Sequence, residues 1–375
     1  MSWACARRRA RRPRDPLRGQ GAALAGRPPA ARRGAAGADG RLAADPVARL
    51  LSGRSGERAP ADFRHRLDSH LLGPLGALQL WWSFPRDEVA RRDALGVPIT
   101  PGAPLPEPAA GTLGVTWLGH ASALLWVDGV TVLVDPVLSA GIPGAAKRLT
   151  PPGRAVDELP ALDAVLLSHD HYDHLDVRTL ARLPRGTRVL AGLNTGPFLR
   201  ARGFTDVTEL DWWESVTLPG RSGPVSVEFV PARHWSRRTA TDTCRRLWGG
   251  WVLTAADGRA VYHAGDTATG PFLHRIAARH RRLEIAALPV GAYRPRSLLR
   301  SVHMDPTEAV RAAETLGARR MVPVHWGTFV LSGEPVLEPL EQTRREWRRT
   351  GRDRADLWDL PIGGSRLLGP TDPSD

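Results

Sequence analysis

The stretch Ser168-His169-Asp170-His171-Tyr172-Asp173-His174 directly follows the apolar run Ala164-Val165-Leu166-Leu167. It reads H-x-H-x-D-H, so three imidazoles and a carboxylate lie within six residues. A solvated polar loop would explain one such histidine. Four ligand-type side chains at the end of a buried strand instead bring neutral nitrogens and an anionic oxygen together, which suits a divalent ion such as zinc. The stretch therefore predicts a metal site.

Two metal ions fit this spacing better than one. His169 and His171 can face one ion, while Asp173 and His174, displaced along the turn, reach a second. A pair of ions about 4 Å apart with a bridging hydroxide is a known hydrolytic device. We therefore expect further ligands downstream.

Three later side chains follow predicted strands in the same way: His234 after residues 224–231, Asp266 after residues 259–263 and His325 after residues 321–324. We expect all three to be metal ligands. The small residues Ala264 and Gly265 precede Asp266 and let the backbone approach the ions. The two carboxylate oxygens of Asp266 could then bridge both metals.

Three more polar residues are expected near the metals. His120 and Asp135 follow the apolar residues 115–118 and 130–134. Each is a candidate partner that orients a ligand, with a satisfied structural polar group as the alternative. His303 lies just before a helix whose Asp305 is the N-cap and whose Glu308 completes a capping box. We expect His303 and this helix N-terminus to favour a substrate anion.

Strand and helix patterns alternate along residues 111–369. Asp128-Gly129 and Asp257-Gly258 each separate two apolar runs and predict β-hairpins. Every expected metal ligand follows a predicted strand. This arrangement predicts an α/β fold in which two β-sheets pack face to face, with helices outside and the metals at one rim.

The 375 residues carry a formal charge of +13, but residues 1–49, with twelve arginines and three aspartates, account for +9 of it. We predict a disordered leader over residues 1–45, an N-terminal extension with a Pro-rich linker over 46–110, the main domain with the metal site over 111–369 and a polar tail over 370–375. The leader contains no continuous apolar segment of signal or membrane-spanning length. The basic leader could bind nucleic acid or anionic lipid. Alternatively, it is an incidental solvated tail without a partner.

Residues 71–82 form an apolar patch too short to span a bilayer. Packing against the main domain is one interpretation, and a surface that touches lipid or an apolar substrate is the other. Cys5 and Cys244 form neither a disulfide framework nor a thiolate metal site, which favours a cytoplasmic enzyme.

The ligand set resembles that of the metallo-β-lactamase superfamily, whose αββα sandwich carries H-x-H-x-D-H followed by distant His, Asp and His ligands. The resemblance implies that His169, His171 and His234 hold one zinc ion. It also implies a second zinc held by Asp173, His174 and His325, with Asp266 as the bridge. Iron or manganese could replace zinc in this ligand set.

Residues 115–329 are also similar to the N-acyl-phosphatidylethanolamine-hydrolysing phospholipase D group. The motifs that carry this resemblance are Thr116-Trp117-Leu118-Gly119-His120-Ala121, Glu209-Leu210-Asp211-Trp212-Trp213-Glu214, Ala264-Gly265-Asp266-Thr267, Pro289-Val290-Gly291-Ala292-Tyr293 and His325-Trp326-Gly327-Thr328-Phe329. Two positions that border the expected active site depart from the group. Val302 stands in place of a glutamine, and Ala268-Thr269 in place of Gly-Tyr.

The resemblance implies a zinc-dependent phosphodiesterase that releases N-acylethanolamine and phosphatidic acid, with Asp266 and His303 as catalytic residues. We expect a phospholipid or other phosphodiester substrate and peripheral contact with the inner membrane surface, and no nucleic-acid partner. A homodimer is left open. The alternatives are a lactonase of the ascorbate-phosphate type, a nuclease like ribonuclease Z, and a non-catalytic metal-dependent binding protein.

Overall fold

The computed structural model describes residues 60–68, 71–100, 102–107 and 109–370. The predicted leader, residues 46–59 of the predicted extension and residues 371–375 of the predicted tail lie outside the described residues. Their predictions stay predictions.

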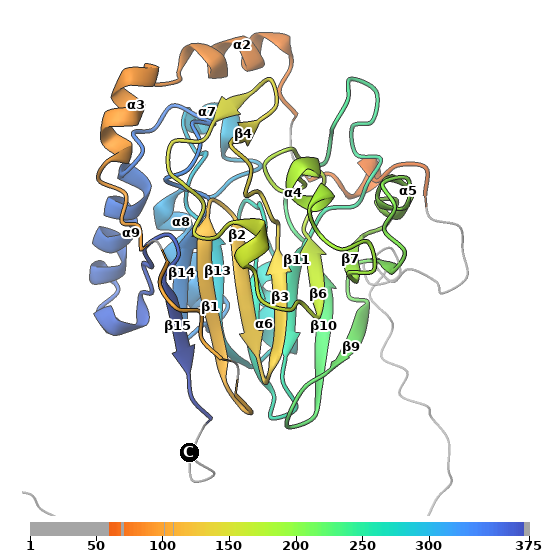
Figure 1. Cartoon of the computed structure of the whole chain (residues 1–375). Helices are drawn as coiled ribbons and strands as arrows, with labels where there is room; N and C mark the ends of the chain where they lie inside the picture. Colours follow the sequence, from red (N-terminus) through yellow and green to blue (C-terminus); the bar gives the residue numbers. More distant parts are fainter. Residues whose placement is uncertain (1–59, 69–70, 101, 108, 371–375) are drawn as a thin grey trace, which may run out of the picture. The chain divides into compact units, whose positions relative to one another are not determined.

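Two β-sheets lie face to face, with helices on their outer faces (Figure 1). The first sheet has the strand order β15-β1-β2-β3-β6-β7-β8. Its strands are β1 (Leu113–Gly119), β2 (Ser122–Val127), β3 (Val130–Val134), β6 (Ala164–Leu167), β7 (Val189–Gly192), β8 (Val207–Leu210) and β15 (Ser365–Leu368). The predicted α/β sandwich, the fold of the metallo-β-lactamases, is confirmed.

The second sheet has the order β14-β13-β12-β11-β10-β9. Its strands are β9 (Ser215–Pro219), β10 (Pro224–Val230), β11 (Gly250–Thr254), β12 (Arg259–His263), β13 (Arg282–Pro289) and β14 (Arg320–Val324). A small separate hairpin joins β4 (Gly141–Ile142) to β5 (Ala146–Lys147).

Strand direction decides where the polar side chains at the strand ends meet. β3 pairs in parallel with β6, and β1 runs in the same direction because β2 is antiparallel to both β1 and β3. In the second sheet β12, β13 and β14 are parallel, and β10 shares their direction through the antiparallel β11. The carboxyl ends of these strands therefore gather at one edge of each sheet.

The helices divide between the two outer faces. α4 (Val177–Ala181) and α5 (Gly196–Arg200) cover the first sheet, and α6 (Phe272–Arg279), α8 (Pro306–Thr315) and α9 (Glu338–Arg349) cover the second. α2 (Pro74–Trp82), α3 (Asp87–Ala94) and α7 (Arg296–Leu299) lie near the edge that receives the carboxyl ends. Three single turns of 3-10 helix complete the described elements: η1 (Arg64–Arg66), η2 (Val156–Glu158) and η3 (Arg354–Asp356).

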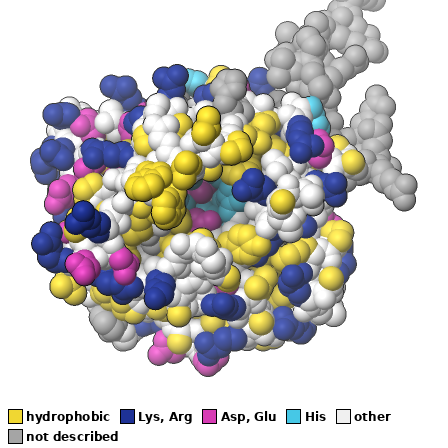
Figure 2. Space-filling view, turned by 90° about the horizontal axis from the view of Figure 1, so that it is seen from above, with side chains coloured by type: hydrophobic (Ala, Val, Ile, Leu, Met, Phe, Trp, Pro, Cys, Tyr) yellow, Lys and Arg dark blue, Asp and Glu magenta, His cyan; other side chains and the backbone are white. Residues whose placement is uncertain are grey.

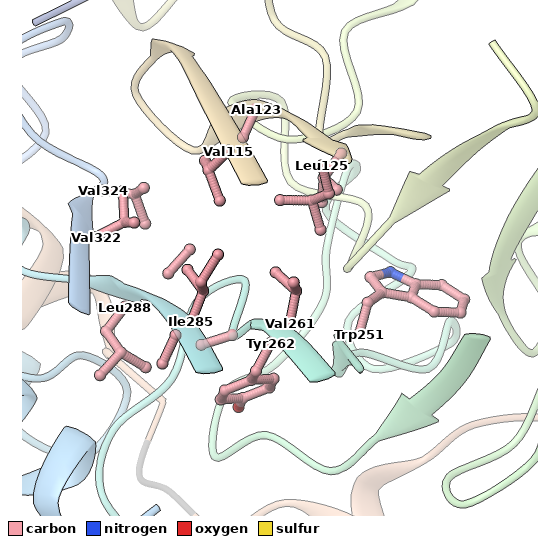
Figure 3. Close-up of a cluster of buried hydrophobic side chains, with 14 of the residues drawn as sticks. Val115, Ala123, Leu125, Trp251, Val261, Tyr262, Ile285, Leu288, Val322 and Val324 are labelled. Carbon is pink, nitrogen blue, oxygen red and sulfur yellow. The ribbon is translucent and has the colours of Figure 1, made fainter. Parts of the chain in front are cut away.

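The main core fills the space between the sheets (Figure 3). In β2, Ala123 and Leu125 point into this core, whereas Leu124 and Trp126 point outward into a second apolar cluster beneath α4 and α5. Both faces of the strand are thus buried, which explains its unbroken apolar sequence. The alternation fixes the register, because a slip by one residue would exchange the two faces.

Two local predictions are confirmed. Asp128 and Gly129 have φ values of 49° and 85° between β2 and β3, as a type I′ hairpin turn requires. At the start of α8, Asp305 accepts the N–H of Glu308, and the Glu308 carboxylate accepts the N–H of Asp305. This is the predicted capping box.

The described part of the N-terminal extension contains both buried and exposed segments. Phe63 and Ala90 are fully buried in the main core, so residues before Gly111 contribute to the same core as the strands. α2, in contrast, has no buried residue. Packing against the domain therefore accounts only for the half-buried side of the patch, which includes Leu72, Gly76 and Leu80. The sequence reading also missed β15, which pairs antiparallel with β1 close to the predicted tail.

Candidate metal centre

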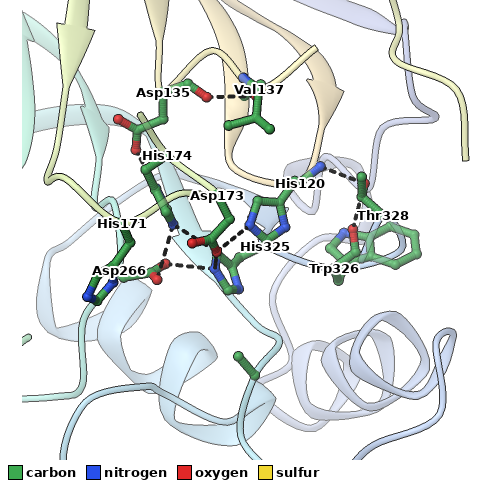
Figure 4. A network of polar contacts seen from close by, with 12 residues as sticks. His120, Asp135, Val137, His171, Asp173, His174, Asp266, His325, Trp326 and Thr328 are labelled. Atoms are coloured by element: carbon green, nitrogen blue, oxygen red, sulfur yellow. Dashed lines mark hydrogen bonds and ion pairs between the residues drawn. The ribbon is translucent and has the colours of Figure 1, made fainter. Parts of the chain in front are cut away.

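All of the predicted site residues gather at the edge where the carboxyl ends of the strands meet. The loop 168–174 leaves β6, and His234, Asp266 and His325 follow β10, β12 and β14. Two sheets thus supply one set of side chains. Figure 4 shows part of this arrangement, including Asp173, Asp266 and His325, with polar contacts as dashed lines.

The first group of potential ligand atoms belongs to His169, His171, His234 and Asp266, and these atoms all lie within 4.8 Å of one another. His171 Nδ1 is 2.9 Å from His169 Nε2 and 3.2 Å from His234 Nε2. Three imidazole nitrogens converge on one point, as a zinc or iron site requires.

The second group consists of His120, Asp173, His174 and His325, again within 4.8 Å. Asp173 Oδ2 lies 3.4 Å from His325 Nε2 and 3.6 Å from His174 Nε2. It is also 2.9 Å from His120 Nε2. This contact with the Asp173 carboxylate is of the kind that an orienting partner makes, and the prediction that His120 orients a ligand stays a prediction.

Asp266 lies between the two groups. Its Oδ2 is 3.1 Å from His174 Nε2 and 3.8 Å from His234 Nε2, and its Oδ1 is 3.1 Å from His325 Nε2. Contacts to both groups are the geometry expected of a bridging carboxylate.

The donor atoms fit metal ions, because several are buried without a hydrogen bond. His174 Nε2, His325 Nε2 and Asp266 Oδ1 are among the buried side-chain atoms that lack a hydrogen-bond partner. An unsatisfied buried polar atom costs about 1–3 kcal/mol. The cluster therefore has unused donor capacity of the kind that cations satisfy.

Asp135 fixes one of the rings from behind. Its carboxylate accepts hydrogen bonds from the Ser168 N–H at 2.7 Å, the Ser168 hydroxyl at 2.6 Å and His174 Nδ1 at 2.8 Å. His174 Nε2 is thereby directed at the second group. Ser168 belongs to the motif but was not predicted as a site residue.

His234 is oriented by a partner that the sequence could not reveal. Its Nδ1 donates to the carbonyl oxygen of Val302 at 3.0 Å. Every residue has a carbonyl, so no side-chain pattern indicates this contact.

The backbone at the centre adopts unusual conformations. His120, Asp135 and His325 have φ values of 54°, 43° and 63°, in the left-handed region that L-residues rarely occupy. The His325 N–H donates to the His120 carbonyl oxygen at 2.9 Å, which ties the end of β14 to the end of β1. Backbone strain is held here by contacts between the sheets, as at many functional sites.

Burial and charge set the protonation of the cluster. Burial and the nearby His234 lower the pKa of His171 to about 3, so its imidazole is neutral. Burial also opposes charge on His325, yet the Asp266 and Asp173 carboxylates raise its pKa to about 9. Metals bind neutral imidazoles and ionised carboxylates, so a metal ion at the second group would have to displace the proton that this raised pKa places on His325.

His303 lies beside both groups. Its Nδ1 is 4.0 Å from Asp266 Oδ2 and is buried without a hydrogen bond. Burial lowers the pKa of His303 well below its usual value, so the ring is neutral. The expected role of the α8 N-terminus is less well supported, because the carboxylate of Asp305 already caps it. We assign no substrate contact to the helix end.

A cavity of about 600 Å³ opens above the ligand groups. Figure 2 shows the hollow, with histidine and acidic side chains on its floor and hydrophobic side chains beside it. The polar lining includes His171, Asp173, His234, Asp266, His303 and His325. The apolar lining includes Leu71, Leu72, Leu80, Ile142, Leu299, Val302 and Leu331.

Comparison with known proteins agrees with this geometry. Residues 130–326 match the family model described as a beta-lactamase superfamily domain. An uncharacterised protein of Mycobacterium tuberculosis is 39% identical over 261 residues, which are 64% of this chain and 68% of that protein. The N-acyl-phosphatidylethanolamine-hydrolyzing phospholipase D 1 of Caenorhabditis elegans is 34% identical over 246 residues, 62% of this chain and 69% of that protein.

Among solved structures, a possible metal-dependent hydrolase from Veillonella parvula superposes with a TM-score of 0.57. The match covers 68% of this chain and 99% of that one, at 17% sequence identity. At this identity the likeness concerns the fold.

Proposed function

Because the chain belongs to the metallo-β-lactamase superfamily and is a metal-dependent hydrolase, we propose that it is a phosphodiesterase of the phospholipase D type. Its substrates would be N-acyl-phosphatidylethanolamine-like lipids, and its products N-acylethanolamine and phosphatidic acid. The observation that carries the proposal is the cavity, in which leucine side chains stand directly beside the metal-ligand groups.

The proposed metal ligands follow the two groups. His169, His171 and His234 would hold one ion, Asp173, His174 and His325 the other, and Asp266 would bridge them. Two zinc ions, or iron or manganese in their place, would supply a hydroxide at neutral pH and offset the negative charge of a phosphodiester.

The residues of the chain have distinct tasks in the proposed reaction. A water oxygen forms a bond to phosphorus, the bond from phosphorus to the ethanolamine oxygen breaks, and that oxygen takes up a proton. Asp266 would accept a hydrogen bond from the attacking water and so orient it. His303, neutral at its low pKa, would donate a hydrogen bond to a phosphoryl oxygen.

The apolar wall accounts for the lipid part of the substrate. Leu72, Leu80 and Leu299 line the same cavity as His303, so an acyl chain could lie against them while the phosphate meets the polar floor. A small soluble diester would leave this wall exposed to water.

The test is hydrolysis of N-acyl-phosphatidylethanolamine in mixed micelles by purified, zinc-loaded protein, with His171→Ala as the control. Release of N-acylethanolamine by the wild type but not by the variant is the expected result. A protein that holds two metals per chain but releases none would contradict the proposal.

A further inference from the structure

Helix α2 presents an apolar surface to solvent. Its nine residues contain no charged side chain. Leu75, Leu78, Trp81 and Trp82 are 83%, 52%, 62% and 73% exposed. Large apolar side chains side by side on a surface mark a contact site for another apolar phase.

The opposite side of α2 faces the substrate cavity. Leu80 lines that cavity, as does Leu72 just before the helix, and Gly76 lies one turn before Leu80. A Cβ atom at Gly76 would lie 3.7 Å from a methyl carbon of Leu298 in α7. One helix thus separates the exposed apolar face from the cavity that leads to the metal ligands.

Basic side chains border the same region. Arg86 follows α2, Arg300 follows α7, and Arg237 lines the cavity mouth, all three exposed. Within the described residues, none of these three guanidinium groups has an ion-pair partner. α3 begins with the acidic Asp87 and Glu88, of which Asp87 is paired within the helix. These arginines exceed the nearby acidic side chains only slightly. Their attraction to anionic lipid would therefore supplement the burial of apolar side chains in the membrane and would not be the main source of affinity.

We propose that α2 is an interfacial helix that docks the protein on a lipid bilayer and brings the cavity mouth to the membrane surface. The inference rests on the proposed function for its substrate but on the α2 surface for its partner. Tryptophan and leucine on one helix face, with arginine beside them, are typical of segments that lie in the headgroup region. Among the described residues no helix is long and apolar enough to cross a membrane, so docking would be peripheral.

The position of the cavity favours a bilayer over a second copy of the chain. Leu71 belongs both to the cavity lining and to the exposed apolar side chains. A second copy seated on this face would cover the mouth through which substrate enters. A bilayer on the same face would instead present its lipids to the mouth.

The test measures binding of the zinc-loaded full chain to vesicles by flotation. Phosphatidylcholine vesicles are compared with vesicles that also contain phosphatidylglycerol. We expect the Leu75→Gln/Trp82→Gln double variant to lose at least about tenfold in vesicle affinity, because two apolar side chains no longer enter the interface. The matched control is Leu95→Gln, since Leu95 is 86% exposed but lies at the far end of α3.

A second readout shows that the double variant is folded. Leu75 and Trp82 do not line the cavity, so hydrolysis of the water-soluble bis(p-nitrophenyl) phosphate should match that of the wild type. Hydrolysis of N-acyl-phosphatidylethanolamine in vesicles should fall with vesicle affinity.

Several outcomes would overturn the inference. Wild-type protein that does not float with vesicles, or a double variant that floats as well as the wild type, would contradict membrane docking. A dimer that the double variant dissociates into monomers would show that α2 is an interface between copies. Equal binding to both vesicle types would refute the basic contribution. Vesicle binding without cleavage of any phosphodiester would leave the docking surface standing and contradict the proposed function.

Discussion

Asp135 shows how a residue behind the centre can control it. Its carboxylate holds His174 Nδ1 and both donors of Ser168. Asp135→Asn would place an amide N–H against one of these donors. We expect metal affinity to fall about 10- to 100-fold, as is usual for such supporting partners. Competition with a chelator measures it.

Asp163→Asn is the matched control for this variant. Asp163 accepts the N–H of Thr131 at 2.7 Å, at the opposite end of the paired strands β3 and β6. It should lower stability without changing metal affinity. If both variants bind zinc as the wild type does, Asp135 has no role in orienting His174.

His303 should affect turnover but not metal content. His303→Gln removes the imidazole that would bind the phosphate, and we expect kcat to fall about a hundredfold. Metal analysis should still find the wild-type stoichiometry. Loss of a metal ion would instead make His303 a ligand, which its 4.0 Å distance to Asp266 would permit.

At the residue scale, the sequence predicted which side chains form the site but not the backbone conformations that hold them. The H-x-H-x-D-H spacing and the strand ends predicted the ligand-type side chains of the two groups, and the helix that follows His303 indicated that residue. The left-handed φ values of His120 and His325 could not be predicted, because contacts between the two sheets impose them. The hydrogen bond between His234 and the Val302 carbonyl could not be predicted either.

The metal-binding loop is held by a cluster of buried charges. Arg246 Nη1 lies 2.7 Å from Asp170 Oδ2 and 2.9 Å from Asp242 Oδ2. Arg238 donates to the carbonyl oxygens of Asp170 and Leu175. The loop 168–174 is thus anchored to the segment that follows His234.

This cluster predicts a pH-dependent contribution to stability. Burial alone would raise the pKa of Asp242, but the N–H groups of Thr239 and Arg238 and the Arg246 guanidinium lower it to about 2. The folded-state pKa lies below the unfolded value, so the contribution is present above about pH 4 and is lost as the pH falls toward 2. We expect Asp242→Asn to cost about 1–2 kcal/mol at neutral pH.

Urea unfolding in the presence of a chelator measures this difference without interference from metal release. The gap between wild type and Asp242→Asn should close as the pH falls below 4. A gap that stays constant down to the lowest pH at which both proteins fold would show that the charge of Asp242 is not the cause.

Elements with strong local signals were the predictable ones. The Asp-Gly turns and the capping box of α8 determine their elements within a few residues. β15 was missed because it pairs with β1, which lies far away in the sequence, as in the pair Leu113 and Leu368. No short turn connects the two strands, so no local sequence signal predicts the pairing. α2 was recognised as apolar, but its exposure depends on what lies around it in the fold.

At the scale of the whole molecule, the centre joins the two sheets. The loop 168–174 extends from the first sheet, while His234, Asp266 and His325 extend from the second. Metal ions bound there would link both halves and favour the folded state. The sequence predicted this meeting because parallel strands bring their carboxyl ends to one edge.

Metal removal should therefore destabilise the entire fold. Free zinc at a hundred times its Kd would add about 2.7 kcal/mol per independent site. We expect Tm to fall by several degrees in excess chelator and to recover on addition of zinc. His171→Ala should show a smaller response, and an unchanged Tm in the wild type would contradict metal ligation by both sheets.

The most direct test of the phosphodiesterase account is hydrolysis of N-acyl-phosphatidylethanolamine in water labelled with heavy oxygen, followed by mass spectrometry of both products. Attack on phosphorus predicts one labelled oxygen in phosphatidic acid and none in N-acylethanolamine. Label in N-acylethanolamine, or release of a labelled fatty acid, would show attack on carbon and contradict the account.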